Sequence, residues 1–236
     1  MKNILIVTFL SAGLLFCQEA AEKAFSGNIS LSAVNRYLWR GKILHDNPAL
    51  QPGVEGTWKD LTLGFWGSVN LGEGEAKGFG EADFYLSYDR AMPMNEKLAF
   101  SAAYNLYTYP VWYDLQDEEY DHEFSLSFSA DVPATPYLSY SIAPSNEFDG
   151  LQWQYFELGG THDIEVKENF SVGIGASAGY GLAEGEAGFS VLGLSVSPAY
   201  RTVVDINPVI FYQVPLGKDY DSDFYIGLTV AYNFEL

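Results

Sequence analysis

The final stretch of the chain, DFYIGLTVAYNFEL (223–236), alternates along its length between apolar residues and small or polar ones. Because successive side chains of an extended strand point to opposite faces of a sheet, this period of two predicts a strand with one apolar face. The pattern recurs throughout the sequence and predicts strands at about 27–40, 50–59, 61–69, 80–89, 97–108, 122–130, 136–143, 152–162, 169–180, 188–197, 203–213 and 223–236. In the segment 188–197 the phase of the alternation is ambiguous. Beyond the N-terminus no apolar run is long enough for a spanning helix, so the sequence predicts an all-β fold.

The connections between these segments alternate in length. Longer loops follow the odd-numbered segments, and shorter turns, such as Lys59-Asp60, follow the even-numbered ones. Long loops at one end and short turns at the other are typical of outer-membrane barrels with an even number of strands. The sequence therefore predicts a transmembrane antiparallel up-and-down β-barrel of about 12 strands, with both termini on the periplasmic side.

Alternation alone fits either a membrane barrel or a soluble β-domain with an apolar interior. The second face of the strands separates the two, because it carries mainly small polar residues such as Ser125, Ser127, Gly173 and Gly175. A water-exposed surface usually carries many charged side chains, whereas small polar groups fit a confined wet lumen. We therefore expect the apolar face to contact lipid, with aromatic girdles near both strand ends. The expected girdle residues are Trp39, Tyr180, Tyr212 and Phe224 at the outer edge and Trp58, Tyr88, Phe128, Phe170, Tyr232 and Phe234 at the inner edge.

The chain is strongly acidic, with 31 Asp and Glu residues against 12 Lys and Arg and a formal net charge of −19. A nucleic-acid-binding surface needs clustered Lys and Arg, so a nucleic-acid partner is not expected. Many of the acids fall in the predicted long loops, as in DEEYD (117–121). An acidic outer rim concentrates cations at the mouth of a pore, which predicts a weak cation preference.

The N-terminus, MKNILIVTFLSAGLLF (1–16), combines one Lys with an apolar core and is typical of a secretory signal. We predict a signal peptide at 1–20, with a boundary as late as residue 24, and a single outer-membrane barrel domain at 25–236. Cys17 is the only cysteine. Lipid attachment there is an alternative, although Phe16 stands where lipid-modified sites usually have a small residue.

Charged residues on the predicted lumen face are the candidate functional residues. By strand parity the pore-lining candidates are Arg36, Arg40, Glu55, Glu81, Asp83, Glu123, Glu157 and Asp205. Rings of charged side chains select solutes by charge in pores. The alternative is that these groups pair with one another and fill a narrow lumen as a plug.

Catalytic motifs are present only in form. GASAG (175–179) has the spacing of a nucleophile elbow, and GIGASA (173–178) has that of a dinucleotide loop, but both need a following helix where the alternation runs on. Asp121-His122 with the carboxylate pair Glu81/Asp83 is the remaining candidate for a barrel hydrolase, and His45-Asp46 with Asp121-His122 is the candidate for a metal site. Nothing in the sequence brings them together, so we expect no catalytic residue, no metal and no cofactor.

One stretch carries a family resemblance. NRYLWRGKILHDNPALQPGVEGTWKDLTLGFWGSVN (35–70) resembles the start of the TorF-type porins of Gram-negative outer membranes. The matching residues are Tyr37, Arg40, Gly41, Pro48, Ala49, Leu50, Gln51, Trp66, Gly67 and Ser68, and GEADFYLSYD (80–89) is similar to the strand that follows in that family. KILHD replaces the usual Ser, Thr and Gln residues after Arg-Gly. The resemblance implies an outer-membrane porin.

The C-terminal strand also resembles the signal that the barrel assembly machinery reads in outer-membrane proteins, with Leu236 in place of the usual terminal aromatic residue. The expected partners are therefore outer-membrane lipid, that machinery and small polar solutes, and the sequence leaves open a homo-oligomer. We expect a passive pore for small polar solutes with weak cation preference. The alternative is a non-conducting barrel with a structural role or with outer loops that bind a partner.

Overall fold

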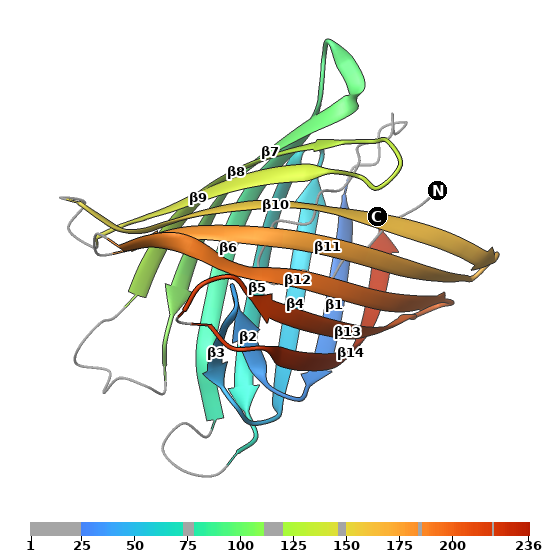
Figure 1. Ribbon diagram of the computed structural model, residues 1–236. Coiled ribbons are helices and arrows are strands. Elements are labelled where there is room, and N and C mark those ends of the chain that lie inside the picture. Colours follow the sequence, from blue (N-terminus) through green and yellow to red (C-terminus); the bar gives the residue numbers. More distant parts are fainter. Residues whose placement is uncertain (1–24, 73–77, 111–119, 146–149, 184–185, 219) are drawn as a thin grey trace.

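The computed structural model describes residues 25–72, 78–110, 120–145, 150–183, 186–218 and 220–236. Twelve strands form a closed antiparallel barrel in the order β1-β14-β13-β12-β11-β10-β9-β8-β7-β6-β5-β4, and β2 and β3 form a separate hairpin (Figure 1). The barrel strands are β1 (Ser26–Val34), β4 (Ala49–Trp58), β5 (Leu61–Asn70), β6 (Gly78–Met92), β7 (Asn95–Thr108), β8 (Tyr120–Ala130), β9 (Tyr137–Pro144), β10 (Leu151–Lys167), β11 (Phe170–Ala183), β12 (Glu186–Arg201), β13 (Asp205–Pro215) and β14 (Asp223–Glu235). The hairpin strands are β2 (Tyr37–Trp39) and β3 (Lys42–His45).

The exposure of alternate residues on β14 shows which face of the strands points out of the barrel. Ile226 is 50% exposed and Leu228 is 44% exposed, whereas Tyr225 and Thr229 are each 2% exposed. Apolar side chains point outward in the same way on other strands, as Leu63 does on β5. The predicted apolar exterior and small polar interior are therefore confirmed, and the soluble alternative with an apolar core is wrong. A sheet surrounded by hydrocarbon must also pair all its backbone N–H and C=O groups, and the closed barrel does so because it leaves no strand edge free.

The barrel closes through its first and last strands. β1 pairs with β14 from Ser26↔Glu235 to Val34↔Gly227, and its other edge pairs with β4. The start of β1 and the end of β14 therefore lie at the same end of the barrel as the turn at residues 59–60 between β4 and β5, because Ser26 pairs with both Glu235 and Thr57. The predicted signal peptide, Cys17 included, lies outside the described residues. Within the described ranges, no helix is long and apolar enough to cross a membrane.

Two sequence predictions about strand ends are wrong. The first strand does not continue to residue 40 but ends at Val34, and the following residues form the hairpin. The predicted long loop after the strand at 169–180 is absent, because β11 and β12 extend until Ala183 pairs with Glu186. The ambiguous phase near residue 190 has a physical cause. The register between β11 and β12 shifts there, and the neighbours Ser190 and Val191 are both buried.

Candidate pore lumen

Small serine and glycine residues line part of the barrel interior. Ser125 and Ser127 on β8, Ser139 and Ser141 on β9 and Gly175 and Ser177 on β11 face a cavity of about 100 Å³. The hydroxyl oxygens of Ser125 and Ser141 lie 2.8 Å apart, which links the two strands across the wall. Leu38, Val209 and Phe211 also line the cavity, so its walls combine hydroxyl groups with apolar side chains. A cavity of this size has room for several waters, which the serine hydroxyls can hydrogen-bond.

The β2–β3 hairpin folds into this interior from the loop between β1 and β4. Arg40 and Gly41 form its tip, both with positive φ, at 48° and 86°, and Trp39 pairs with Lys42 across it. Two residues with positive φ are what a tight hairpin turn between twisted strands requires. Leu38, which is 1% exposed, packs in an apolar cluster with Val34, Val209 and Tyr225 of the barrel.

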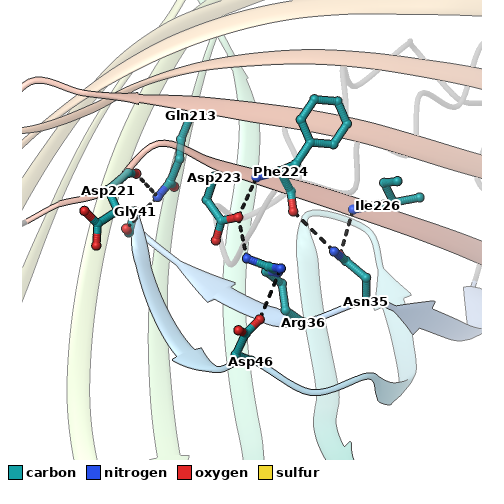
Figure 2. A network of polar contacts seen from close by, with 9 residues as sticks. All are labelled: Asn35, Arg36, Gly41, Asp46, Gln213, Asp221, Asp223, Phe224 and Ile226. Atoms are coloured by element: carbon teal, nitrogen blue, oxygen red, sulfur yellow. Dashed lines mark hydrogen bonds and ion pairs between the residues drawn. The ribbon is translucent and has the colours of Figure 1, made fainter.

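The base of the hairpin is fixed to the barrel by a polar network, which Figure 2 shows. The Asn35 side chain donates to the Phe224 carbonyl at 3.2 Å and accepts from the Ile226 amide at 2.8 Å, which caps the end of the β1–β14 ladder. Arg36 forms an ion pair with Asp223 and a second one with Asp46 at 3.2 Å. Hydrogen bonding to Asp223 raises the pKa of Arg36, so this guanidinium stays charged.

The tip of the hairpin is held from two sides. On one side, the Gln213 side-chain amide of β13 donates to the Gly41 carbonyl and to the Asp221 carbonyl, each at 2.9 Å (Figure 2). On the other side, Arg40 Nη2 lies 2.9 Å from Glu123 Oε2 on β8 and donates to Ser141 on β9 at 3.2 Å. β13 and β8 are separated by four strands along the sheet. The hairpin therefore crosses the lumen and connects two parts of the wall.

The guanidinium of Arg40 also lies among aromatic rings. Its Cζ atom is 4.5 Å from the ring centre of Trp153 and 4.6 Å from those of Tyr155 and Trp39. Cations are attracted to aromatic faces at such distances, more strongly where water is excluded. Trp39 packs edge-on against Trp153 in the interior. The prediction that Trp39 belongs to the lipid-facing girdle is therefore wrong, because the chain has already left β1 at this point.

Carboxylates gather beside the hairpin and adjoin the serines of β8, since Ser125 donates a hydrogen bond to Glu123 at 2.8 Å. Glu81 and Asp83 on β6 and Glu123 on β8 are 3%, 0% and 0% exposed, and Asp83 interacts electrostatically with the other two. Among the described residues, neither carboxyl oxygen of Asp83 has a hydrogen-bond partner. The buried ring of Tyr37 on β2 packs 5.5 Å from Trp66 and interacts with Glu81 and Asp83. The hairpin thus covers an acidic patch.

The structure brings five of the eight sequence candidates together around the hairpin: Arg40, Glu81, Asp83, Glu123 and Glu157. Glu157 faces the cavity and accepts a hydrogen bond from Tyr137 at 2.7 Å. The other three lie apart. Arg36 is at the hairpin base, Glu55 on β4 accepts from Tyr85 at 2.8 Å, and Asp205 at the start of β13 accepts from Asn233 at 3.0 Å.

Sequence reasoning missed the hairpin, and with it Leu38, Trp39 and Gln213. A signal was present in YLWRGKIL (37–44), where a dipeptide ending in Gly separates two short apolar runs. That pattern is typical of a two-residue hairpin turn. It was hidden because the alternation of β1 continues in phase through Tyr37 and Trp39.

The residues considered for catalysis and metal binding come together only in part: Asp121 interacts electrostatically with Glu81, whereas His122 contacts Tyr104. Ser177 lies within the continuous strand β11 and pairs with Gly159, so no sharp turn exposes it. His122 contacts Tyr104 at 2.7 Å and stacks on its ring, whereas Asp121 accepts from Tyr109, and the two neighbours lie on opposite faces of β8. Across the residues that the structure describes, no group of three or more His, Cys, Asp or Glu is placed to hold a metal ion.

Comparisons with known proteins agree with this architecture. The COG4313 outer membrane channel from Pseudomonas putida F1 aligns over 91% of this chain and 97% of its own, at 11% identity and a TM-score of 0.53. The NanC porin aligns over 86% of this chain and 98% of its own, at 8% identity and a TM-score of 0.55. A search of curated proteins finds no match to the sequence.

The apolar exterior and the fold shared with these proteins identify the chain as an outer-membrane β-barrel. Residues 17–192 match the model of one bacterial family, which is about three quarters of the sequence. The chain therefore belongs to the Gcw_chp family, described as bacterial proteins of unknown function.

Proposed function

We propose that the protein is an outer-membrane pore for the passive diffusion of small polar solutes, with a weak preference for cations. The observation that carries this proposal is the polar interior of a closed barrel, where serine and glycine residues surround a cavity. The TorF-type pattern in residues 35–70 favours the same reading. We further propose that β14 is the strand read by the barrel assembly machinery. Homo-oligomer formation remains a hypothesis.

The cation preference follows from the charges along the lumen. Of the eight candidate pore-lining residues, six are carboxylates and two are arginines, and Arg40 lies against Glu123. Most of the acidic residues that the sequence places in the outer loops lie outside the described residues, so the structural part of the argument rests on the carboxylate of Glu157, which lines the cavity. Glu81 and Asp83 are buried beside the hairpin and are not part of that lining. Fixed negative charge in a narrow passage with low-dielectric walls raises the local concentration of cations.

Planar-bilayer recording tests this function. The purified protein should conduct, and a potassium chloride gradient should give a reversal potential of the sign expected for cation preference, decreasing at high salt because of screening. The variant Glu157→Gln, which removes a carboxylate from the cavity wall, should move the reversal potential toward zero. Glu168→Gln, in the turn between β10 and β11, is the matched control and should leave it unchanged. Anion preference in the unmodified protein would contradict the proposal.

A non-conducting barrel is the second candidate, and the hairpin that crosses the lumen favours it. The two functions separate in a variant whose residues 37–45 are replaced by a short Gly-Ser linker. If the unmodified protein conducts and the variant conducts more, the protein is a pore narrowed by its hairpin. If only the variant conducts, the hairpin is a permanent plug and the barrel has a structural or binding role.

A further inference from the structure

Arg40 occupies a pocket that the barrel wall builds without it. The pocket is formed by Trp153 and Tyr155 on β10 and by Glu123 on β8, with Ser141 beside them on β9. These strands hold their side chains through the ladder, with pairs such as Trp153↔Ala143 between β10 and β9. The pocket therefore does not depend on the hairpin for its shape, apart from the additional ring of Trp39.

The pocket has the chemistry of a site for an organic cation. Two aromatic faces lie about equally far from the guanidinium carbon, and the carboxylate of Glu123, which is 0% exposed, lies 2.9 Å from Nη2. Glu157 adds a second negative charge that interacts with Arg40. Aromatic faces combined with carboxylates recognise planar or alkylated cations, because the ring quadrupole and the charge act together.

The pocket also opens on the lumen cavity. Arg40, Tyr155, Glu157 and Ser141 all line that cavity, so a solute in the pore reaches Tyr155 and Glu157, and it reaches Trp153 and Glu123 behind them once Arg40 has moved away. Arg40 itself adopts a φ of 48°, in the left-handed region that favours glycine. A glycine would adopt this φ with less strain, so the backbone conformation does not explain the presence of Arg40. Its side-chain contacts with the wall do.

We propose that Trp153, Tyr155, Glu123 and Glu157 form a binding site for guanidinium-type cations, which Arg40 occupies as a tethered ligand. A free cation of this class competes with Arg40 and releases the tip of the hairpin from the wall. The binding site stands on its own geometry, whereas the consequence for solute passage rests on the proposed pore function.

The test uses Arg40→Gly, which removes the tethered ligand and suits the positive φ. Its folding is checked by the shift in gel migration on heating. Guanidinium chloride at millimolar concentration should change the tryptophan fluorescence saturably, whereas sodium chloride at equal ionic strength should not. The unmodified protein should need about tenfold or more guanidinium, because the tethered side chain competes at a high effective concentration.

The control is the double variant Arg40→Gly/Glu123→Gln, in which the saturable response should be lost. A folded Arg40→Gly protein that responds equally to guanidinium and sodium, or a double variant that still binds guanidinium, would overturn the site. Conductance is measured separately with both salts. Guanidinium binding without conductance in any variant would leave the binding site standing and remove the pore function.

Discussion

The contact between Arg40 and Glu123 is the part of the hairpin anchorage that a single substitution tests most directly. Glu123→Gln keeps the size of the side chain and one oxygen acceptor, and it removes the charge that faces the guanidinium at 2.9 Å. The remaining anchors are untouched, namely Leu38 in its apolar cluster, the bond from Gln213 to Gly41 and the ion pair of Arg36 with Asp223. The hairpin should therefore stay mainly docked but open more often.

The size of the effect follows from the burial of the pair. Glu123 is fully buried, and the Arg40 side chain is 12% exposed, so solvent weakens this contact little. The contact is an ion pair, and removing one partner of a buried pair costs about 3–5 kcal/mol; the neutral amide of Gln, which keeps an oxygen beside the guanidinium, should cost less than complete removal. Taking about 2 kcal/mol, the population of the undocked hairpin should rise roughly 30-fold, since 1.4 kcal/mol corresponds to a factor of ten.

Limited trypsin digestion measures this population. Trypsin is too large to enter the barrel, so it cleaves the Arg40–Gly41 bond only when the hairpin has left the lumen, and the cleavage rate follows this undocked population when reclosing is fast. The folded barrel in detergent is digested briefly, and the fragments are identified by mass spectrometry. Glu123→Gln should be cut at this bond roughly 30-fold faster than the unmodified protein, in line with the energy above.

Glu55→Gln is the matched control, because Glu55 bonds to Tyr85 on the barrel wall. Its cleavage rate should equal that of the unmodified protein. Equal rates for Glu123→Gln, in a barrel that still shows heat-modifiable migration, would refute the conclusion that the Arg40 contact holds the hairpin.

Three further predictions concern other parts of the molecule. A Cβ added at Gly160 would lie 2.5 Å from a backbone carbonyl oxygen of the β8–β9 turn, whereas a Cβ added at Gly188 would have no atom within 4 Å. Gly160→Ala should therefore lower the free energy of unfolding, measured in urea, by about 1–3 kcal/mol, and Gly188→Ala should lower it by less than about 0.5 kcal/mol. Leu228→Arg on the lipid face should lower stability in bilayers by about 2–4 kcal/mol, but Val203→Arg in the β12–β13 turn by less than about 1, measured by the same titration. Burial in the docked hairpin lowers the pKa of His45 below 6.5. The undocked hairpin therefore binds a proton at a higher pH than the docked one, and docking weakens as the pH falls through 6.5. Trypsin cleavage, corrected for the pH profile of trypsin itself, should increase over this range, and the increase should be absent in His45→Gln.

The faces of the strands and the number of strands could be predicted from the sequence because both follow from local periodicity. Side chains at positions two apart share a face, so Leu228 and Val230 outside and Thr229 inside could be assigned without knowing any partner strand. The same parity placed Glu81, Asp83 and Glu123 in the interior, as the structure has them. Parity gave no information on how far along the barrel each of these residues lies.

The tertiary structure decided everything that depends on register and on the path of the loop after β1. Glu81 and Asp83 lie near Glu123 only because β7 sets the stagger between β6 and β8. Arg40 reaches Glu123 only because the chain turns inward after Val34, and that turn is stabilised by contacts of Leu38 and Gln213 with residues far away in the sequence. Periodicity is a local property of the chain, whereas the meeting of distant side chains is set by the closure of the whole barrel, so the sequence alone determined the barrel and only its closure determined the site.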